Sequence, residues 1–387
     1  MNNDSSFLPF TTPDHELLRD QVRRFVQTEV LPKAMSWESS GDIPREVILH
    51  MGELGLLGMR FPEQYGGGAA DTTMSVVLAE ELGRSGFGGF AITILTQTDT
   101  ASPVINAVGT EDQKKRYLPK IVSGDCLVAI AMTEPDAGSD IASLRTRATS
   151  LGGDGWMLDG AKTFITNGVN ADLYIVAART DPNALKPAHG VSLFLVEKGT
   201  PGFGVSRRLD KMGWRSSDTA ELFFDSCRLP ANALLGTLNR GFHALMKNVQ
   251  NERLVLGAQA LGEAQLAIEL TLEHVRQRKA FGSTLWQKQV IRQRLAELAS
   301  RVESARHFVY SVAVMDERGI DCVKQVSMVK AICGELVNDV VHSCLQFHGG
   351  SGYMSGTVIE RMYRDVRVHA IGGGATEVML EEIAKRL

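Results

Sequence analysis

The chain has 387 residues, which is long enough for two or three domains that each have a hydrophobic core. Its hydrophobic content of 44% and charged content of 22% are typical of a soluble globular protein. A net charge of −4 gives no electrostatic reason to expect a nucleic-acid partner, and no apolar run approaches the roughly 18 residues of a membrane-spanning helix. We therefore expect neither a nucleic acid nor a membrane as a partner.

The cysteines, histidines and N-terminus bear on the compartment and on metal binding. The five cysteines are an odd number without a CxxC pair, which favours a reducing compartment and argues against a disulfide framework or a zinc site. The nine histidines form no HxxxH or HxxEH pattern, so we expect no metal site. The N-terminus carries Asp4, Asp14, Glu16 and Asp20 and lacks a basic start followed by an apolar core, so we expect neither a secretory signal nor a transit peptide. Together these features predict a cytoplasmic protein.

Residues 1–125 have the pattern of a helical domain. Thr12 followed by Pro13 is typical of a helix N-cap with proline at the first helical position, and apolar residues recur at helical spacing up to Pro32. Further helical patterns cover residues 45–57, 73–82 and 111–118.

Residues 126–235 have a different pattern, in which short β-rich runs alternate with Gly, Asn and Pro. This pattern predicts a compact antiparallel β-domain. The runs cover residues 127–130, 173–178, 191–196 and 221–224. Residues 160–168 predict a further strand that ends in Asn-Gly, a strong turn signal.

Residues 236–387 return to helical patterns, which cover residues 242–277, 286–318, 321–347 and 377–387. Three to four long helices with short breaks predict a four-helix bundle. The predicted fold class is therefore α+β, with an N-terminal helical domain, a middle antiparallel β-domain and a C-terminal four-helix bundle.

The first candidate site is the stretch Ala-Met-Thr-Glu-Pro-Asp-Ala-Gly-Ser-Asp at residues 131–140. It follows a predicted buried strand and breaks into a turn, because Pro135 cannot donate to a sheet and Gly138 tolerates unusual backbone angles. Thr133 and Ser139 are therefore free to face a ligand. A plain surface turn rich in Asp, Ser and Gly has the same pattern.

The second candidate site combines Arg-Lys-Ala-Phe-Gly at residues 278–282 with the glycine-rich stretch at residues 346–353. An arginine guanidinium binds phosphate through a planar donor fork, and glycines let backbone amides approach a pyrophosphate closely. The alternative is a helix-end arginine and a glycine-rich helix C-cap.

Together these stretches resemble the acyl-CoA dehydrogenase family, and the resemblance runs in the family's order from near residue 12 to the C-terminus. The resemblance implies that the chain binds FAD. In this family the positions of Arg278 and Gln289 usually reach the FAD of a neighbouring subunit, so a homo-oligomer is implied, with a tetramer favoured. The residues that the resemblance assigns to FAD are Ala131, Met132, Thr133, Ser139, Phe164, Ile165, Thr166, Arg278, Phe281, Gln289, Gln346, Gly349, Gly350, Thr376 and Glu377.

The catalytic base is where the chain departs from many relatives. Oxidation of a thioester to its 2,3-enoyl form needs a desolvated carboxylate that takes the α-proton. Many relatives place this base on a C-terminal loop, at the position that Gly373 occupies in this chain. A subset that includes isovaleryl and long-chain members places it on the first bundle helix, where Glu252 stands. We therefore predict Glu252 as the base and the Gly373 backbone N–H as a donor to the thioester carbonyl.

Two alternatives concern this base. Glu252 on its own could be a solvated helix carboxylate paired with a cation. Glu377 is a rival because it lies only four residues past Gly373, although it could equally sit in the first turn of the last helix, where acids are favoured.

The resemblance also predicts the substrate and the electron acceptor. The coenzyme A substrate is expected to contact Ser139, Gln250, Asn251 and Arg253, and its acyl chain is expected to lie against residues 92–105. We expect α,β-dehydrogenation of a long or branched acyl-CoA, with an electron-transfer flavoprotein as acceptor. The alternatives are a flavin oxidase or monooxygenase of the same fold and a non-catalytic flavoprotein.

Overall fold

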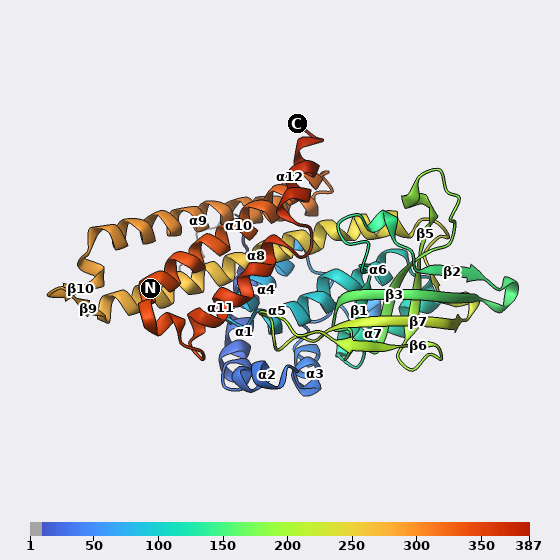
Figure 1. Cartoon of the computed structure of the whole chain (residues 1–387), viewed down its shortest axis with the longest axis horizontal. Coiled ribbons are helices and arrows are strands. Elements are labelled where there is room, and N and C mark those ends of the chain that lie inside the picture. The colour runs from blue at the N-terminus through green and yellow to red at the C-terminus, as the bar shows by residue number, and fades with distance from the viewer. Residues whose placement is uncertain (1–9) are drawn as a thin grey trace.

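The structure is a computed structural model that describes residues 10–387, and the part of the predicted N-terminal domain before residue 10 lies outside it. An N-terminal group of helices, a β-sheet and a long helical bundle follow one another along the chain (Figure 1). The predicted α+β architecture of three domains is therefore confirmed.

The N-terminal part is helical, as predicted. Thr12 precedes the first helix and Pro13 opens it, and the Thr12 N–H donates to His15 Nδ1 at 2.9 Å. The elements are α1 (Pro13–Phe25), a π-helix (Val26–Val30), α2 (Ala34–Ser40), α3 (Arg45–Glu53), α4 (Thr72–Gly83), α5 (Gly88–Leu95), a second π-helix (Thr96–Ala101), α6 (Ser102–Val108) and α7 (Glu111–Ser123).

Two of these helices differ from the predicted ranges and three were not predicted. The helix predicted at residues 45–57 ends at Glu53, and the one predicted at 111–118 continues to Ser123. Helix α5 has no amphipathic period because all eight of its residues are buried, so its sequence shows no polar face. The short helices α2 and α6 were also not predicted.

The middle part is an eight-stranded sheet in the order β6-β7-β3-β2-β4-β5-β8, with β1 paired to β4. Most neighbours are antiparallel, but β4 pairs parallel with β1, where Val128 is opposite Leu173, and with β2, where Arg147 is opposite Arg179. The prediction of a purely antiparallel sheet is wrong at this point, because the β2–β3 pair and the loops between β1 and β4 return the chain to the same end of the sheet. The strands are β1 (Val128–Ala131), β2 (Arg147–Ser150), β3 (Trp156–Thr166), β4 (Leu173–Arg179), β5 (Val191–Glu197), β6 (Phe203–Arg208), β7 (Thr219–Leu229) and β8 (Leu234–Leu235).

The C-terminal part contains three long helices and two short ones. The long helices are α8 (Gly241–Gln277), α9 (Gln289–Glu317) and α10 (Val323–His348), and the short ones are α11 (Val358–Asp365) and α12 (Thr376–Ala384). A small hairpin of β9 (Lys279–Ala280) and β10 (Ser283–Thr284) joins α8 to α9 at one tip of the molecule (Figure 1). Within residues 10–387, no helix combines the length and the apolar character needed to cross a membrane.

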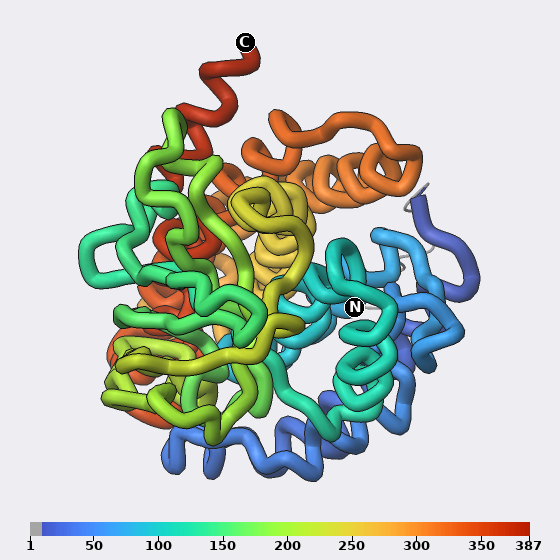
Figure 2. Tube along the Cα trace, turned by 90° about the vertical axis from the view of Figure 1, so that its right-hand side faces the viewer, coloured from blue at the N-terminus to red at the C-terminus, as the bar shows by residue number. Residues whose placement is uncertain are grey.

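Helix α8 is the element that all three parts share. It has 37 residues, which corresponds to about 55 Å at 1.5 Å per residue. Seen along the long axis of the molecule, the N-terminal helices, the sheet and the rest of the bundle surround the start of α8 (Figure 2). The first half of α8 is therefore held on several sides, which fixes the direction of the side chains that it carries.

Close backbone contact joins α8 to α4. A β-carbon added to Gly262 on α8 would overlap the carbonyl oxygen of Glu80 on α4, and one added to Gly83 on α4 would overlap the carbonyl oxygen of Gln259. Because backbone atoms cannot yield as side chains do, both positions require glycine.

We predict that Gly262→Ala lowers the melting temperature, because the added methyl group forces α4 and α8 apart. Overpacking of this kind costs about 1–3 kcal/mol. Thermal unfolding followed by circular dichroism measures the effect. Gly153→Ala is the matched control, because a β-carbon at Gly153 meets no atom within 4 Å. Equal melting temperatures for the two variants would contradict this account of the helix contact.

Candidate active site

Glu252 on α8 lies against the glycine turn that precedes α12. A β-carbon placed on Gly373 would lie 3.3 Å from Glu252 Oε1 and would overlap Leu256 Cδ1. Gly373 also has a φ of +65°, a left-handed conformation that favours glycine. The structure thus brings together the two residues that the sequence paired, and the missing side chain at Gly373 leaves the space in which the Glu252 carboxylate ends.

The Glu252 carboxylate is largely buried, and its oxygens are free to accept a hydrogen bond or a proton from a ligand. Burial raises its pKa above the ordinary value near 4.5, while the nearby cations Arg253 and Lys330 act in the opposite direction. Among residues 10–387, no side chain or backbone group donates a hydrogen bond to it. A desolvated carboxylate without an internal partner can accept a proton from a ligand, so the geometry suits a general base.

Lys330 on α10 is a site residue that the sequence prediction missed. Its Nζ donates to the carbonyl oxygens of His369 and Gly374, the latter at 3.2 Å, on either side of the glycine turn. Burial lowers its pKa to about 8, although Glu252 opposes this change. A signal was present in the sequence, because Lys330 interrupts the otherwise apolar stripe of α10 that includes Val326 and Val337.

The other predicted substrate residues on α8 point in different directions. Asn251 is bonded within the protein: its Oδ1 accepts from Arg60, and its Nδ2 donates to the Asp99 backbone carbonyl at 3.0 Å. Its amide therefore ties α8 to the second π-helix, which argues against the expected contact with substrate.

Gln250 and Arg253 each retain an unbonded polar atom among the described residues. Gln250 Oε1 and Arg253 Nε are buried and have no hydrogen-bond partner there. Arg253 lies beside the glycine turn, since a β-carbon on Gly374 would be 3.5 Å from its Nε. Burial lowers the pKa of Arg253, while Glu252 opposes that change. These two residues keep the capacity to bind a polar ligand.

The first group of predicted FAD residues lies where β1 and β3 end. The Thr163 N–H donates to the Thr133 carbonyl at 2.9 Å, which places the two strand ends side by side. Phe164 has a φ of +58° and is 69% exposed, so its ring stands away from the core and can cover a planar ligand. Ala131 and Ile165 are buried in the core, so only their backbone atoms can contact a cofactor.

A buried ion pair supports this edge of the sheet. Lys162 Nζ donates to Glu134 Oε1 at 2.8 Å and to the Met132 carbonyl at 3.0 Å, and Glu134 in turn accepts from two backbone amides. The backbone on either side of Thr133 is therefore fixed before a ligand arrives. Ser139 lies beyond this support, on an exposed part of the turn.

The second group of predicted FAD residues lies at the opposite end of the bundle. Arg278 follows the end of α8, Phe281 lies in the β9–β10 hairpin, and Gln289 opens α9. Gln346 lies near them because α10 runs alongside α8. The rings of His274 and His348 stack there, with their centroids 4.3 Å apart. Gly349 and Gly350 leave open space around their backbone.

One chain cannot bring the two groups to the same cofactor. About 26 residues of α8 separate Glu252 from Arg278, which is about 39 Å along a helix. Figure 1 shows the hairpin at one end and the sheet at the other.

The last two predicted residues belong to α12. Thr376 opens this helix and donates to Glu335 Oε1 at 2.8 Å, whereas Glu377 is exposed in its first turn. An exposed carboxylate is not desolvated, so Glu377 lacks the environment that a base for an α-proton needs.

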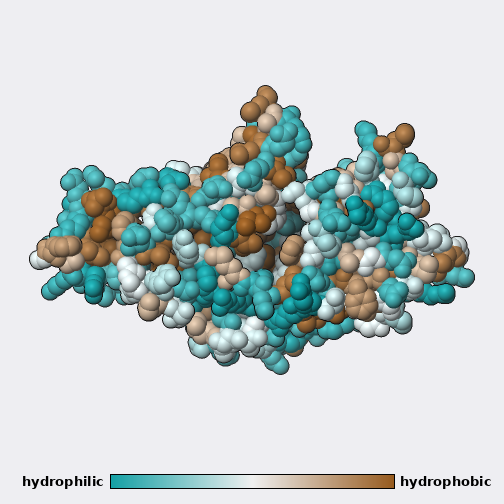
Figure 3. Space-filling view, viewed as in Figure 1, coloured by the Kyte–Doolittle hydropathy of each residue, from teal (hydrophilic) through white to brown (hydrophobic). Residues whose placement is uncertain are grey.

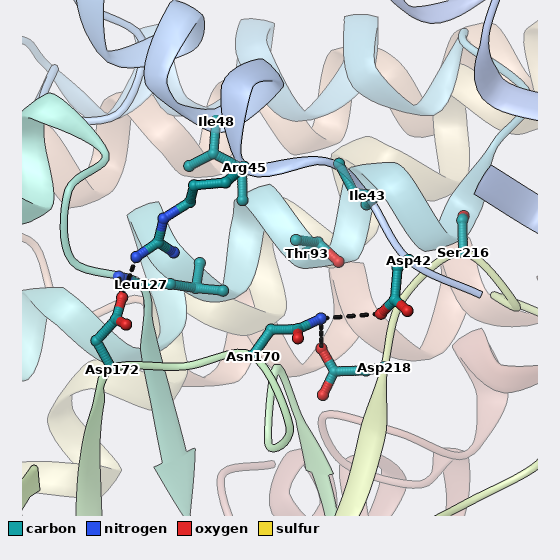
Figure 4. A pocket seen from close by; sticks show the side chains of 10 residues that line it. All are labelled: Asp42, Ile43, Arg45, Ile48, Thr93, Leu127, Asn170, Asp172, Ser216 and Asp218. Atoms are coloured by element: carbon teal, nitrogen blue, oxygen red, sulfur yellow. Dashed lines mark hydrogen bonds and ion pairs between the residues drawn. The ribbon is translucent and has the colours of Figure 1, made fainter. Parts of the chain in front are cut away.

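A cleft of about 330 Å³ lies elsewhere, between the N-terminal helices and the sheet (Figure 4). Its acidic side chains have partners in the protein: Arg45 pairs with Asp172, and Asn170 donates to Asp42 and Asp218 at 3.0 and 3.2 Å. These bonds join the two domains. Within residues 10–387, no group of three or more His, Cys, Asp or Glu side chains is arranged to hold a metal ion.

Comparisons with known proteins agree with this organisation. Profiles of the N-terminal, middle and C-terminal acyl-CoA dehydrogenase domains match residues 12–125, 129–227 and 239–387. The mitochondrial long-chain specific acyl-CoA dehydrogenase of Mus musculus is 43% identical over 374 residues, 97% of this chain and 86% of its own. The mitochondrial isovaleryl-CoA dehydrogenase of Pongo abelii is 36% identical, over 93% of this chain and 85% of its own.

A solved structure shows the same arrangement. The acyl-CoA dehydrogenase from Geobacillus kaustophilus superposes with a TM-score of 0.94 at 42% identity, covering 98% of this chain and 99% of its own.

We predict that Gly373→Ala destabilises the protein, because its methyl group meets both the Glu252 carboxylate and Leu256 in a left-handed conformation. The backbone strain alone costs about 1–2 kcal/mol. Chemical unfolding measures the loss. Gly372→Ala is the neighbouring control, since its β-carbon meets nothing closer than 3.5 Å. If both alanines unfold at the same denaturant concentration, neither crowding nor positive φ makes glycine necessary in this turn.

Proposed function

Because the chain belongs to the acyl-CoA dehydrogenase family, we propose that it oxidises the Cα–Cβ bond of an acyl-CoA thioester to the 2,3-enoyl-CoA with Glu252 as the base. The observation that carries this proposal is the desolvated Glu252 carboxylate ending in the space that Gly373 leaves open. The family is one of oxidoreductases that use FAD.

The proposed chemistry divides between the chain and its cofactor. The Glu252 carboxylate takes the α-proton, and the electron pair of that C–H bond moves toward the thioester carbonyl. The backbone N–H of Gly373 donates to this oxygen as negative charge develops on it, an arrangement that stabilises enolates in other enzymes. FAD, when bound, accepts the hydrogen that leaves Cβ with its electron pair.

The raised pKa of Glu252 fits this role. A carboxylate in water is too weak a base for an α-proton, and burial brings its basicity closer to that of the carbon acid. Arg253 and Lys330 act in the opposite direction and limit this increase in the pKa of Glu252.

A composite cofactor site supports the proposal that the enzyme is a homo-oligomer, with a tetramer favoured. The group around Thr133 and Phe164 and the group around Arg278 lie at opposite ends of the chain, so a partner subunit must complete each FAD site. Apolar side chains gather at the hairpin end of the molecule (Figure 3), where Phe281 is 95% exposed in the single chain. A partner that covers this end removes that apolar surface from water.

We further propose a long or branched acyl chain and an electron-transfer flavoprotein as acceptor. The similarity to a long-chain and to an isovaleryl enzyme supports the substrate class. Residues 92–105 fit the wall of an acyl cavity, because they form a buried helix interrupted by a π-helix at Thr96–Ala101, and such interruptions are frequent at functional sites. Five free cysteines are consistent with the expected cytoplasmic location.

We predict that Glu252→Gln slows anaerobic bleaching of the bound flavin by acyl-CoA at least 10²-fold, because the amide cannot take the proton. Isovaleryl-CoA and palmitoyl-CoA serve as branched and long-chain probes, and stopped-flow absorbance measures the rate. Glu377→Gln is the control and should bleach at the wild-type rate. The base assignment is wrong if Glu252→Gln bleaches at the wild-type rate and Glu377→Gln is the slow variant. Rapid oxygen consumption by the wild type without an acceptor would instead indicate an oxidase.

We predict complementation between two inactive variants, Glu252→Gln and Arg278→Ala, when both are expressed in one cell. In a mixed pair, one site combines the intact Glu252 of one subunit with the intact Arg278 of the other. Random assembly then restores about a quarter of the wild-type sites. Differently tagged subunits allow the mixed oligomer to be purified and assayed. No activity in that fraction would contradict a cofactor site shared between subunits.

A further inference from the structure

Lys330 is a buried cation without a hydrogen-bonded carboxylate. It lies on α10 with 2% of its surface exposed, among apolar neighbours that include Val326 and Val337. Its acceptors in the described chain are two backbone carbonyls. Taking an ammonium out of water for neutral acceptors alone is costly, so a position of this kind needs a further reason.

The two acceptors bracket the glycine turn. One is the carbonyl of His369, before the turn, and the other is the carbonyl of Gly374, at 3.2 Å. Gly373 and Gly374 both have positive φ, at +65° and +110°, and a turn of successive glycines has much conformational freedom to lose. Because one ammonium binds both ends of this turn, it restricts the backbone of the turn. It thereby fixes the direction of the Gly373 N–H.

The Lys330 side chain also lies close to the Glu252 carboxylate. The position of a β-carbon on Gly373 is 3.3 Å from Glu252 Oε1 and 3.6 Å from Lys330 Cε, so the two side chains lie within about 7 Å of each other. Two charges at this distance shift the pKa of a partly buried group by about one unit or more.

The other charged or titratable groups around Lys330 do not replace Glu252 as its partner. Arg253 on α8 has the same sign as Lys330. Burial raises the pKa of the Cys333 thiol to about 12, so it is neutral, and the exposed carboxylate of Glu335 acts on Lys330 more weakly than Glu252 because water screens its charge. Glu252 is therefore the main anion that compensates the Lys330 charge.

We propose that Lys330 is a positioning residue of the active site, whose ammonium both fixes the glycine turn that presents the Gly373 N–H and keeps the Glu252 carboxylate ionised. This inference rests on the proposed function. When the α-proton moves to Glu252, that carboxylate becomes neutral and negative charge appears on the thioester oxygen near Gly373. The positive charge of Lys330 is then compensated by the thioester oxygen instead of the Glu252 carboxylate. It therefore stays compensated through the proton transfer.

Three substitutions separate the two roles. Lys330→Met removes the charge and the donor, Lys330→Gln removes the charge and keeps a donor, and Lys330→Arg keeps both. Lys211→Met is the matched control, because Lys211 also donates to a backbone carbonyl, that of Ser217 at 2.6 Å, and its charged neighbours do not include Glu252.

The pH profile of flavin bleaching by isovaleryl-CoA or palmitoyl-CoA is the first readout. In the wild type, the rate falls as pH drops through the raised pKa of Glu252. We expect Lys330→Met and Lys330→Gln to move this acid-side midpoint up by about one pH unit, because the carboxylate loses its cation. The glutamine variant should keep a higher plateau rate than the methionine variant. Lys330→Arg should restore the wild-type midpoint, and Lys211→Met should keep it.

Thermal stability supplies a second readout that needs no substrate. Because the pKa of Glu252 is raised by folding, its ionised form destabilises the native state as pH rises from the unfolded-state pKa to the folded one. The melting temperature of Glu252→Gln should therefore exceed that of the Glu252 enzyme by an amount that grows with pH and then levels off. In the Lys330→Gln background, the levelling should occur about one pH unit higher.

The outcomes distinguish this inference from the proposed function. A levelling pH that does not change between the wild-type and Lys330→Gln backgrounds overturns the role of Lys330, even if the wild type is bleached normally by acyl-CoA. A shift in that pH upholds the role of Lys330 as the cation that holds Glu252 ionised. If neither acyl-CoA bleaches the wild type while the shift is present, the proposed reaction fails and the electrostatic coupling stands.

Discussion

The contact between Glu252 on α8 and the glycine turn before α12 is the constraint on which the rest of the structure depends. A carboxylate can act on a carbon acid only if it is kept from water and aimed, and both conditions require that its backbone does not move. Helix α8 meets that requirement because α4 touches it backbone to backbone through Gly262 and Gly83. Asn251, one residue before the base, ties the same turn of α8 to the π-helix that contains Asp99. The contacts of α4 and Asn251 with α8 therefore also fix the direction of the proposed base.

Much of the fold could be predicted from the sequence because its strongest signals are local. The long helices of the bundle have clear periods, and Pro13 marks a helix start. Helix α5 could not be found in this way, because a helix buried on all sides has no polar face. The parallel pairing of β1 with β4 was also missed, since strand direction depends on the path of the chain between them.

The candidate site also contains residues that could be predicted from the sequence and residues that could not. Glu252 and Gly373 could be paired because the family resemblance places the base at one of two positions, and this chain has glycine at the first and a carboxylate at the second. Lys330 could not be assigned, because its role depends on two carbonyls that are distant in sequence and come close only in the fold. The expected contact of Asn251 with substrate stays a prediction, although its amide is bonded to Arg60 and Asp99 within the protein.

The proposed base lies on a long helix, and the turn opposite it contains glycines. Gly373 and Gly374 both adopt positive φ, where a glutamate at either position would be strained. Moving the carboxylate to α8 removes that strain and leaves the turn a single task, which is to present its backbone N–H. Because the helix places this carboxylate away from water, its charge must be balanced by nearby cations. Arg253 on α8 and Lys330 on α10 balance this charge. The position of Glu252 on the helix therefore requires the buried lysine on the neighbouring helix.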